Sequence, residues 1–208
     1  MELFFSILAS LFSVVNPLGA LPVYLSMTPN YTQAERNRTA RNASLYFAII
    51  LLTFFLAGSL ILSFFGISLS AMRIAGGMMI LSSAYSLLVG KQAENRTVNK
   101  EVEAEAMEKS DISFAPLAMP LLSGPGSISL LIGIYAEYPN WQEKAIIVGV
   151  ILATSILVFL ILRSAPYIYK VLGVAGLNAM SRIMGFIVMT IAVQYIIGGI
   201  VDLVKGLS

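Results

Sequence analysis

The segment Val15-Asn16-Pro17-Leu18-Gly19-Ala20-Leu21-Pro22 lies inside the first long apolar stretch, where a helix that crosses a membrane should continue without interruption. Pro17 and Pro22 have no N–H to donate to the preceding helical turn, and their rings clash with its carbonyl groups. Gly19 adds a permissive backbone between them. This segment therefore predicts a break in a membrane helix.

A second segment of the same kind, Pro120-Leu121-Leu122-Ser123-Gly124-Pro125-Gly126-Ser127, lies near the middle of a later apolar stretch, about half a chain away. Broken helices at corresponding positions of two halves are the best sequence indication of a transporter's binding site. The alternative is that each break is only a structural kink, at which Ser and Asn side chains form hydrogen bonds with the freed backbone groups. Because the breaks are paired, we favour the functional interpretation.

The composition is that of an integral membrane protein. Of 208 residues, 58% are hydrophobic and only 12% are charged, whereas about a quarter are charged in soluble domains. The chain has no cysteine and no histidine, which excludes disulfides, Cys or His metal sites and imidazole catalysis. A net charge of +2 does not indicate nucleic-acid binding. The start, Met1-Glu2-Leu3, has no basic region, so we expect a retained span and no signal peptide.

The apolar stretches predict an all-α protein with six transmembrane helices, because a span needs roughly 20 apolar residues. The expected spans are 3–25, 43–65, 69–90, 114–135, 145–162 and 183–204. They divide into a three-helix unit at 1–90, a polar cytoplasmic linker at 91–111 and a second three-helix unit at 112–208. Thr32 and Glu35 have the spacing of a capping box before the second span. Gly66 and Ser68 mark a tight turn after it.

The two units also match in sequence. Arg73-Ile74-Ala75-Gly76 is followed by Arg182-Ile183-Met184-Gly185 at nearly the separation of Pro17 from Pro125. Three spans per unit is an odd number, so a duplication places the units in opposite orientations, as an inverted 3+3 repeat with helices 1 and 4 broken. Lys and Arg are concentrated in the first, third and fifth loops, including 163–182. By the positive-inside rule, both termini lie outside a plasma (inner) membrane.

Catalysis is not expected, because the spans hold no nucleophile with a base and no metal ligands at depth. Broken helices can instead bind through backbone carbonyl groups at one half-helix end and N–H groups at the next. These opposite partial charges suit a zwitterion, which carries an ammonium and a carboxylate. The candidate substrate-binding residues are Ser13, Asn16, Pro17, Gly19, Ala20, Ser123, Gly124, Pro125, Gly126 and Ser127. Gln194 and Tyr195 either line the pathway or bond between helices, whereas Arg73 and Arg182 are interpreted as interface anchors.

At these residues the chain resembles the MarC family of six-span membrane proteins. Asn16-Pro17-Leu18-Gly19, together with Pro120 and Ser123-Gly124-Pro125-Gly126, carries the resemblance, which extends nearly end to end. It implies a transporter of small neutral amino acids of the SnatA type, which moves glycine and alanine with an ion gradient. It also implicates Asn16, Pro17, Gly19, Gly124, Pro125 and Gly126 in function.

We therefore expect a secondary transporter for glycine, alanine and serine. It would need no cofactor beyond a coupling ion, H⁺ or Na⁺, and no partner beyond its substrates and the lipid bilayer. The alternatives are a channel for small neutral solutes, a drug or metabolite exporter, and a membrane scaffold. The direction of transport and the oligomeric state stay open.

Overall fold

The computed structural model describes residues 1–89 and 112–206, in which every regular element is a helix. The elements are α1 (Glu2–Val15), α2 (Pro17–Met27), α3 (Gln33–Phe65), α4 (Leu69–Val89), η1 (Ser113–Leu122), α7 (Pro125–Glu137), α8 (Trp141–Arg163) and α9 (Ala165–Lys205). Within these ranges, five helical stretches are long and apolar enough to cross a membrane, or six if η1 and α7 form one bent span. The predicted all-helical membrane fold is confirmed, and the predicted linker at 91–111 lies outside the described residues.

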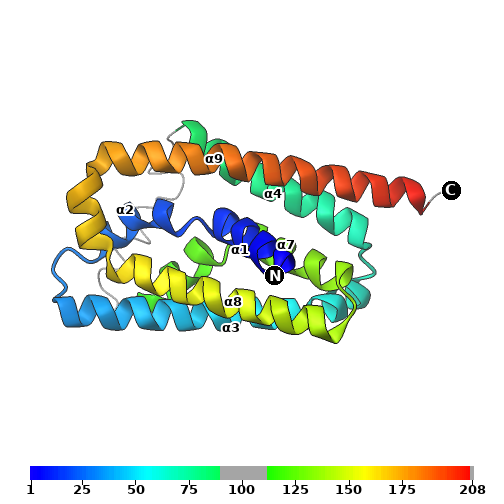
Figure 1. Cartoon of the computed structure of the whole chain (residues 1–208), viewed down its shortest axis with the longest axis horizontal. Coiled ribbons are helices and arrows are strands. Elements are labelled where there is room, and N and C mark those ends of the chain that lie inside the picture. The colour runs from blue at the N-terminus through cyan, green and yellow to red at the C-terminus, as the bar shows by residue number, and fades with distance from the viewer. Residues whose placement is uncertain (90–111, 207–208) are drawn as a thin grey trace.

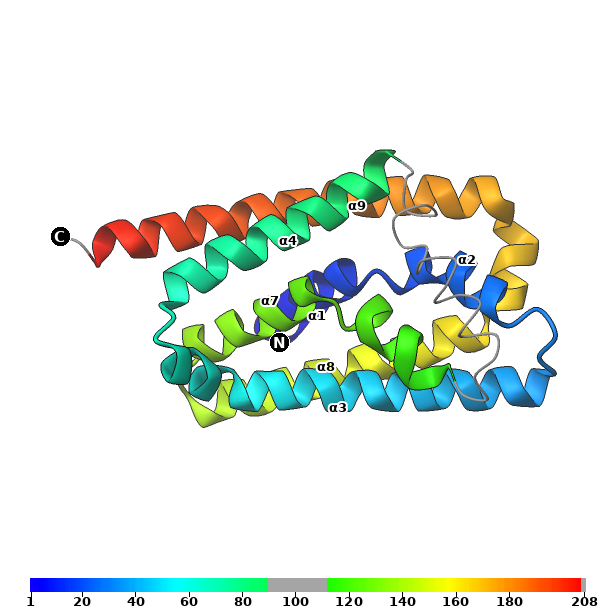
Figure 2. The ribbon, with the colours of Figure 1, turned by 180° about the vertical axis from the view of Figure 1, so that it is seen from behind.

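The helices form three layers (Figure 1). α4 and α9 pack along one side, and α3 and α8 run side by side along the other. Between these pairs lie α1, α2, η1 and α7, which the opposite view shows clearly (Figure 2). Leu11, Phe47 and Leu131 are fully buried members of the core that joins the middle layer to α3 and α8.

Glycines allow α4 and α9 to approach closely. A Cβ added at Gly199 would lie 2.9 Å from the Ser70 carbonyl oxygen, and one at Gly185 would lie 3.1 Å from the Ala84 carbonyl oxygen. A backbone carbonyl cannot move aside as a flexible side chain can. Small residues at membrane helix interfaces permit such backbone contact, which favours association through van der Waals packing.

The backbone leaves helical geometry between α1 and α2 at Asn16. This residue has φ 46° and ψ 64°, in the left-handed region that Asn tolerates better than most residues. Its N–H donates to the Phe12 carbonyl and so closes α1, while its Oδ1 accepts from the Gly19 N–H at 3.2 Å and caps α2. Pro17 occupies the first turn of α2, where a missing N–H costs nothing.

The second Pro/Gly-rich segment bends the chain. η1 is a wide helix in which Ala115 and Met119 have non-helical backbone angles, as expected for residues that precede Pro116 and Pro120. It ends at Leu122, and α7 begins at Pro125 after a bend of 65°.

Two local predictions are confirmed. The Thr32–Glu35 capping box is present, with both reciprocal hydrogen bonds at the start of α3. Gly66 ends α3 at φ 64°, a conformation that favours glycine, and α4 begins at Leu69 after a short turn.

The predicted loop before the last span is wrong. α9 already begins at Ala165, so Lys170 and Arg182 both lie in helical segments. Only Gly173, at φ 62°, departs from helical geometry, and the chain turns a corner there (Figure 1). The residues after Gly173 continue as helix because Leu177 and Ser181 are buried, with α9 packed against α2.

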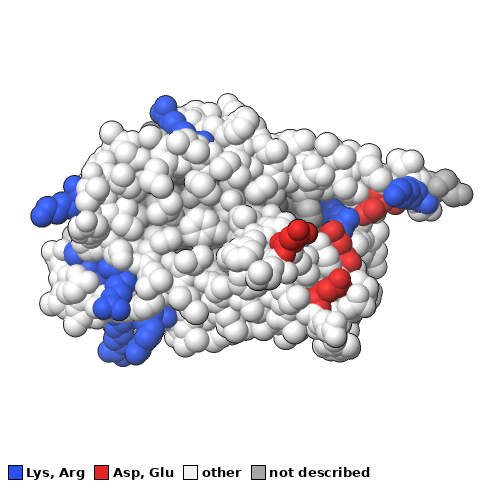
Figure 3. All heavy atoms as spheres, viewed as in Figure 1, with Lys and Arg blue, Asp and Glu red and all other residues white. Residues whose placement is uncertain are grey.

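Charges separate toward the two ends of the bundle (Figure 3). Most of the visible Lys and Arg lie at the end where α3 begins and α8 ends, which we call the basic end, although Arg73 pairs with acidic residues at the other end. Asp and Glu gather at the opposite, acidic end, where α7 ends and α8 begins. Because the helices between them are apolar, this separation is the one expected for a protein whose two ends face water.

Candidate functional site

The second Pro/Gly-rich segment lines a cavity of about 300 Å³, which we call the Gly126 cavity. Four predicted residues, Gly124 to Ser127, contribute to it at the start of α7. The other lining residues come from α1, α4, η1 and α9: Val14, Val15, Met79, Ile80, Ser83, Pro120, Leu121, Leu122 and Val188. The end of α1 and the start of α7 therefore meet at one cavity.

Gly126 allows the start of α7 to pack closely against α1 and α4. A Cβ added there would lie 2.8 Å from Ile80 Cγ1 and 3.7 Å from Val14 Cγ1. No side chain caps α7, and Ser127 Oγ donates to the Gly124 carbonyl at 2.9 Å. The first N–H groups of a helix have no intrahelical acceptor, so this end of α7 presents a partial positive charge.

The remaining predicted residues do not line the Gly126 cavity. Ser13, Asn16 and Ser123 are buried beside it in the chain, whereas Pro17, Gly19 and Ala20 are buried in α2. Ala20 belongs to the main apolar core. The N–H of Gly19, one of the candidate binding residues, is bonded to Asn16 Oδ1.

Two residues that adjoin the cavity lining in sequence each have a polar atom without a hydrogen-bond partner in the described part of the chain. Asn16 Nδ2 and Ser123 Oγ are both buried, and each residue is only 1% exposed. Asn16 directly follows Val15, and Ser123 lies between Leu122 and Gly124; all three of these neighbours line the cavity. An unpaired buried polar group costs about 1–3 kcal/mol, so these atoms are suited to a ligand or water.

A second cavity of about 510 Å³, which we call the Arg73 cavity, lies toward the acidic end. Gln194 and Tyr195, the predicted pathway residues, both line it. The other lining residues are Ser6, Ile7, Ser10, Arg73, Leu130, Ile134, Glu137, Tyr138, Thr190, Ile191 and Gly198. Among the described lining residues, charged side chains, Arg73 and Glu137, occur only at this second cavity and not at the Gly126 cavity.

The two cavities lie in series along α1, α4, α7 and α9. In α7, Gly124 to Ser127 line the first, and Leu130, Ile134 and Glu137 line the second. Ser129 lies between these sets, and its Oγ donates to the Met72 carbonyl in α4 at 3.3 Å. Tyr195 in α9 donates to the Ser129 carbonyl. The helices are thus tied together between the cavities.

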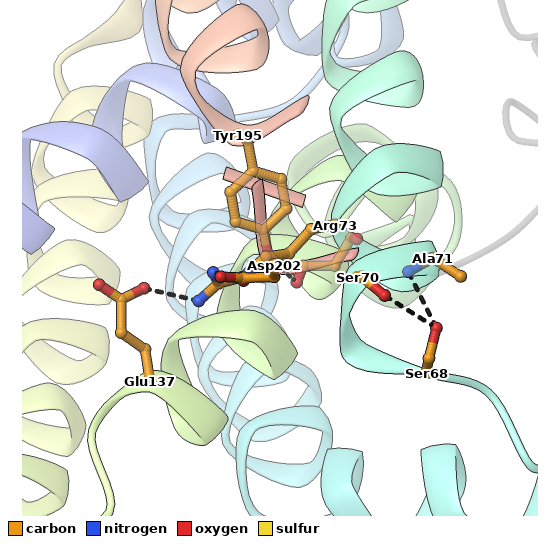
Figure 4. Close-up of polar contacts among 8 residues, drawn as sticks. Ser68, Ser70, Ala71, Arg73, Glu137, Tyr195 and Asp202 are labelled. Atoms are coloured by element: carbon orange, nitrogen blue, oxygen red, sulfur yellow. Dashed lines mark hydrogen bonds and ion pairs between the residues drawn. The ribbon is translucent and has the colours of Figure 1, made fainter. Parts of the chain in front are cut away.

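Arg73 differs from the interface anchor that its sequence position indicates. Its side chain is 12% exposed and forms ion pairs with Glu137 at 2.9 Å and Asp202 at 2.5 Å (Figure 4). The predicted topology could have indicated these ion pairs. It places the start of the third span, with Arg73, on the same side of the membrane as the ends of the fourth and sixth spans, with Glu137 and Asp202. Ile80 and Ser83 were missed as lining residues; their signal is helical spacing from Gly76.

The family profile described as MarC family integral membrane protein matches residues 1–204. The chain is 41% identical over 202 residues to the UPF0056 membrane protein MJ1677 of Methanocaldococcus jannaschii, covering 96% of this chain and 98% of that protein. It is 36% identical over 207 residues to the UPF0056 membrane protein YhcE of Escherichia coli strain K12, covering 98% and 94%. It is 33% identical over 217 residues to the UPF0056 inner membrane protein MarC of Citrobacter koseri, covering 99% and 98%. No solved structure matches significantly.

Proposed function

Since the chain belongs to the MarC family of integral membrane proteins, we propose that it is an ion-coupled secondary transporter of small neutral amino acids, and not an enzyme. The substrate zwitterion binds at the Gly126 cavity, between the end of α1 and the start of α7. The protein lies in the inner membrane with its basic end toward the cytoplasm.

The observation that carries this proposal is a pair of buried atoms, Asn16 Nδ2 and Ser123 Oγ, which have no hydrogen-bond partner among the described residues and belong to residues that adjoin the cavity lining in sequence. Polar groups at membrane depth are tolerated where they line protein or a water-filled cavity. A carboxylate accepts hydrogen bonds from an amide N–H and a hydroxyl, so both atoms suit the carboxylate of an amino acid.

Backbone polarity supports the same ligand. The last carbonyl groups of α1 carry partial negative charge, and the first N–H groups of α7 carry partial positive charge. An ammonium group suits the former and a carboxylate the latter. We propose that these interruptions are the broken helices of an inverted repeat. The pairing of α3 with α8 and of α4 with α9, around a middle layer that holds both interruptions, supports this.

The size and polarity of the Gly126 cavity favour a small neutral substrate. Among the described residues, no charged side chain lines it, and its volume of about 300 Å³ is at the low end for ligand pockets. A drug exporter would need a larger pocket. A channel for small solutes fits the volume equally well, so the test must separate a carrier from a channel.

A counterflow assay in proteoliposomes distinguishes a carrier from a channel. A carrier exchanges labelled alanine for unlabelled alanine and accumulates the label transiently, whereas a channel only equilibrates it. We expect transient accumulation with the wild-type chain. Label that rises only to equilibrium would favour the channel, and no amino-acid flux would reject the proposed substrate.

Two near-isosteric variants test the site. Asn16→Asp keeps the oxygen that caps α2 but replaces Nδ2, and Ser123→Ala removes only the hydroxyl; both should reduce alanine counterflow about tenfold or more. Ser44→Ala is the matched control, because Ser44 Oγ is also buried without a partner among the described residues but lies in α3, beside neither cavity. Normal counterflow in both site variants would reject this site.

A further inference from the structure

The guanidinium group of Arg73 in α4 contacts α7 and α9 at the acidic end, and one of its three nitrogen atoms has no hydrogen-bond partner among the described residues. Its Nη2 contacts Glu137 Oε2 at the end of α7, and its Nη1 contacts Asp202 Oδ2 in α9 (Figure 4). Its Nε is buried and has no hydrogen-bond partner in the part of the chain that the structure describes. The edge formed by Nε and Nη2 is therefore only half occupied.

This edge can bind one carboxylate through two hydrogen bonds. Nε and Nη2 point their N–H groups in parallel, so one carboxylate can accept from both at once. Glu137 uses only Nη2. A ligand carboxylate that bound both atoms would satisfy the buried Nε, which Glu137 leaves without an acceptor.

The surrounding charges suit an ammonium group on the same ligand. Arg73 carries one formal positive charge, while Glu137 and Asp202 together carry two negative charges. If a ligand displaced Glu137 from Arg73, the freed carboxylate would lie beside the ligand. Ser10, Thr190 and Gln194 add polar groups to a cavity of about 510 Å³, which is ample for a small amino acid.

We propose that the Arg73 cavity is a second binding site for an amino-acid zwitterion, in series with the Gly126 cavity. The ligand carboxylate binds Nε and Nη2 of Arg73 in place of Glu137, and the ligand ammonium binds Glu137. The assignment of an amino acid rests on the proposed function. Binding here loosens the tie between α4 and α7 and leaves the Asp202 ion pair in place.

Ligand protection of a single cysteine tests this site without measuring transport. The natural chain contains no cysteine, so Ser10→Cys introduces one thiol into the Arg73 cavity. Its labelling rate by a water-soluble thiol reagent is measured in proteoliposomes. Alanine should slow the reaction, whereas propionate and ethylamine, which carry one charge each, should not at the same concentration. Protection by propionate alone as strong as by alanine would overturn the zwitterion site.

Three variants in the Ser10→Cys background separate binding from a structural ion pair. Arg73→Gln and Glu137→Gln should each raise the alanine concentration for half-protection about tenfold or more, because each removes a charged partner. Asp202→Asn is the control, since it removes an ion pair of Arg73 but leaves the Nε and Nη2 edge intact. Equal loss in all three variants, or protection that survives Arg73→Gln, would overturn the proposal.

A further variant makes failure of this site distinguishable from failure of the proposed function. Gly126→Leu fills the other cavity, and alanine should still protect the thiol introduced by Ser10→Cys in that background. Loss of protection in Gly126→Leu would show that the label reports the Gly126 cavity, which would overturn the second site. Protection in an otherwise wild-type background that gives no alanine counterflow would reject the proposed transport and support the second site. Helical circular dichroism of each variant verifies that it is folded.

Discussion

The hydroxyl of Tyr195 in α9 donates a 2.8 Å hydrogen bond to the Ser129 carbonyl in α7, at the level where the Gly126 cavity gives way to the Arg73 cavity. The phenol lies over Gly133, one turn along α7, where an added Cβ would overlap Tyr195 Oη. A side chain at 133 and the tyrosine hydroxyl therefore cannot both occupy their positions. This makes the contact between α7 and α9 sensitive to small changes on either side.

Tyr195→Phe should lower the free energy of unfolding by about 1 kcal/mol, the usual contribution of one hydrogen bond. Gly133→Ala should cost more, about 1–3 kcal/mol, because the added methyl group must displace the ring. In the double variant part of the Gly133→Ala defect should disappear, since the displaced oxygen is absent. Thermal unfolding in detergent, followed by circular dichroism, measures all three. Simple additivity would show that the hydroxyl does not limit the space at residue 133.

The α4–α9 contact predicts a second stability effect. Gly199→Ala places a methyl group 2.9 Å from a backbone oxygen, that of Ser70, and should destabilise the protein by about 1–3 kcal/mol. Gly149→Ala in α8 is the matched control, because the nearest atom to its added Cβ is Phe4 Cε2 at 3.9 Å. It should leave stability unchanged or raise it, since alanine favours helix. Equal melting temperatures for the two variants would mean that α4 and α9 are not held at this distance.

Much of the fold could be predicted because long apolar stretches identify membrane helices, and a few Pro, Gly and capping residues indicate where the helices begin and end. Helices α2 and α7 begin at Pro17 and Pro125, within the two Pro/Gly-rich segments, and Thr32 marked the start of α3 correctly. The helix through Lys170 and Arg182 was missed because charged residues lower the mean hydropathy there. A helix does not end merely because it leaves the apolar layer, and Gly173 is the only residue there with non-helical angles.

The candidate site was harder to predict because a cavity is formed by residues from several helices. The Pro/Gly motif identified Gly124 to Ser127, but nothing in the local sequence distinguishes Val188 from residues that face lipid, and Ile80 is indicated only by its helical spacing from Gly76. Asn16 illustrates the opposite difficulty. Its type and position indicated binding, yet its Oδ1 caps α2, and its Nδ2 is the atom left without a partner among the described residues.

The charge separation predicts the orientation in the membrane. Ala34→Cys near the start of α3 is exposed at the basic end, and Gln142→Cys near the start of α8 is exposed at the acidic end. Because Lys and Arg favour the cytoplasmic side, an impermeant thiol reagent added to intact cells should label residue 142 and not residue 34. Glu103→Cys, in the predicted cytoplasmic linker, should also stay unlabelled. The reverse pattern would place both termini in the cytoplasm.

If transport is coupled to an ion, accumulation of the amino acid against its concentration gradient should require a gradient of that ion. With H⁺ or Na⁺ as the driving ion, labelled glycine should accumulate in proteoliposomes only when one of these gradients is imposed, and the matching ionophore should abolish accumulation. Exchange at equal concentrations should persist without the gradient. Accumulation that ignores both gradients would reject ion coupling.

Selectivity is the prediction that depends most directly on the Gly126 cavity. Its lining includes Gly124, Gly126, Ser127 and apolar side chains such as Val14 and Ile80, so the described residues offer no partner for a charged substrate side chain. Burying an unpaired charge costs several kcal/mol, whereas one poorly fitting methylene changes discrimination by only about 1–3 kcal/mol. Alanine and serine should therefore compete with labelled glycine at similar concentrations, while lysine and glutamate should need concentrations at least about a hundredfold higher. If lysine or glutamate competes strongly and alanine does not, then neither the Gly126 cavity nor a small neutral amino acid can be the basis of transport.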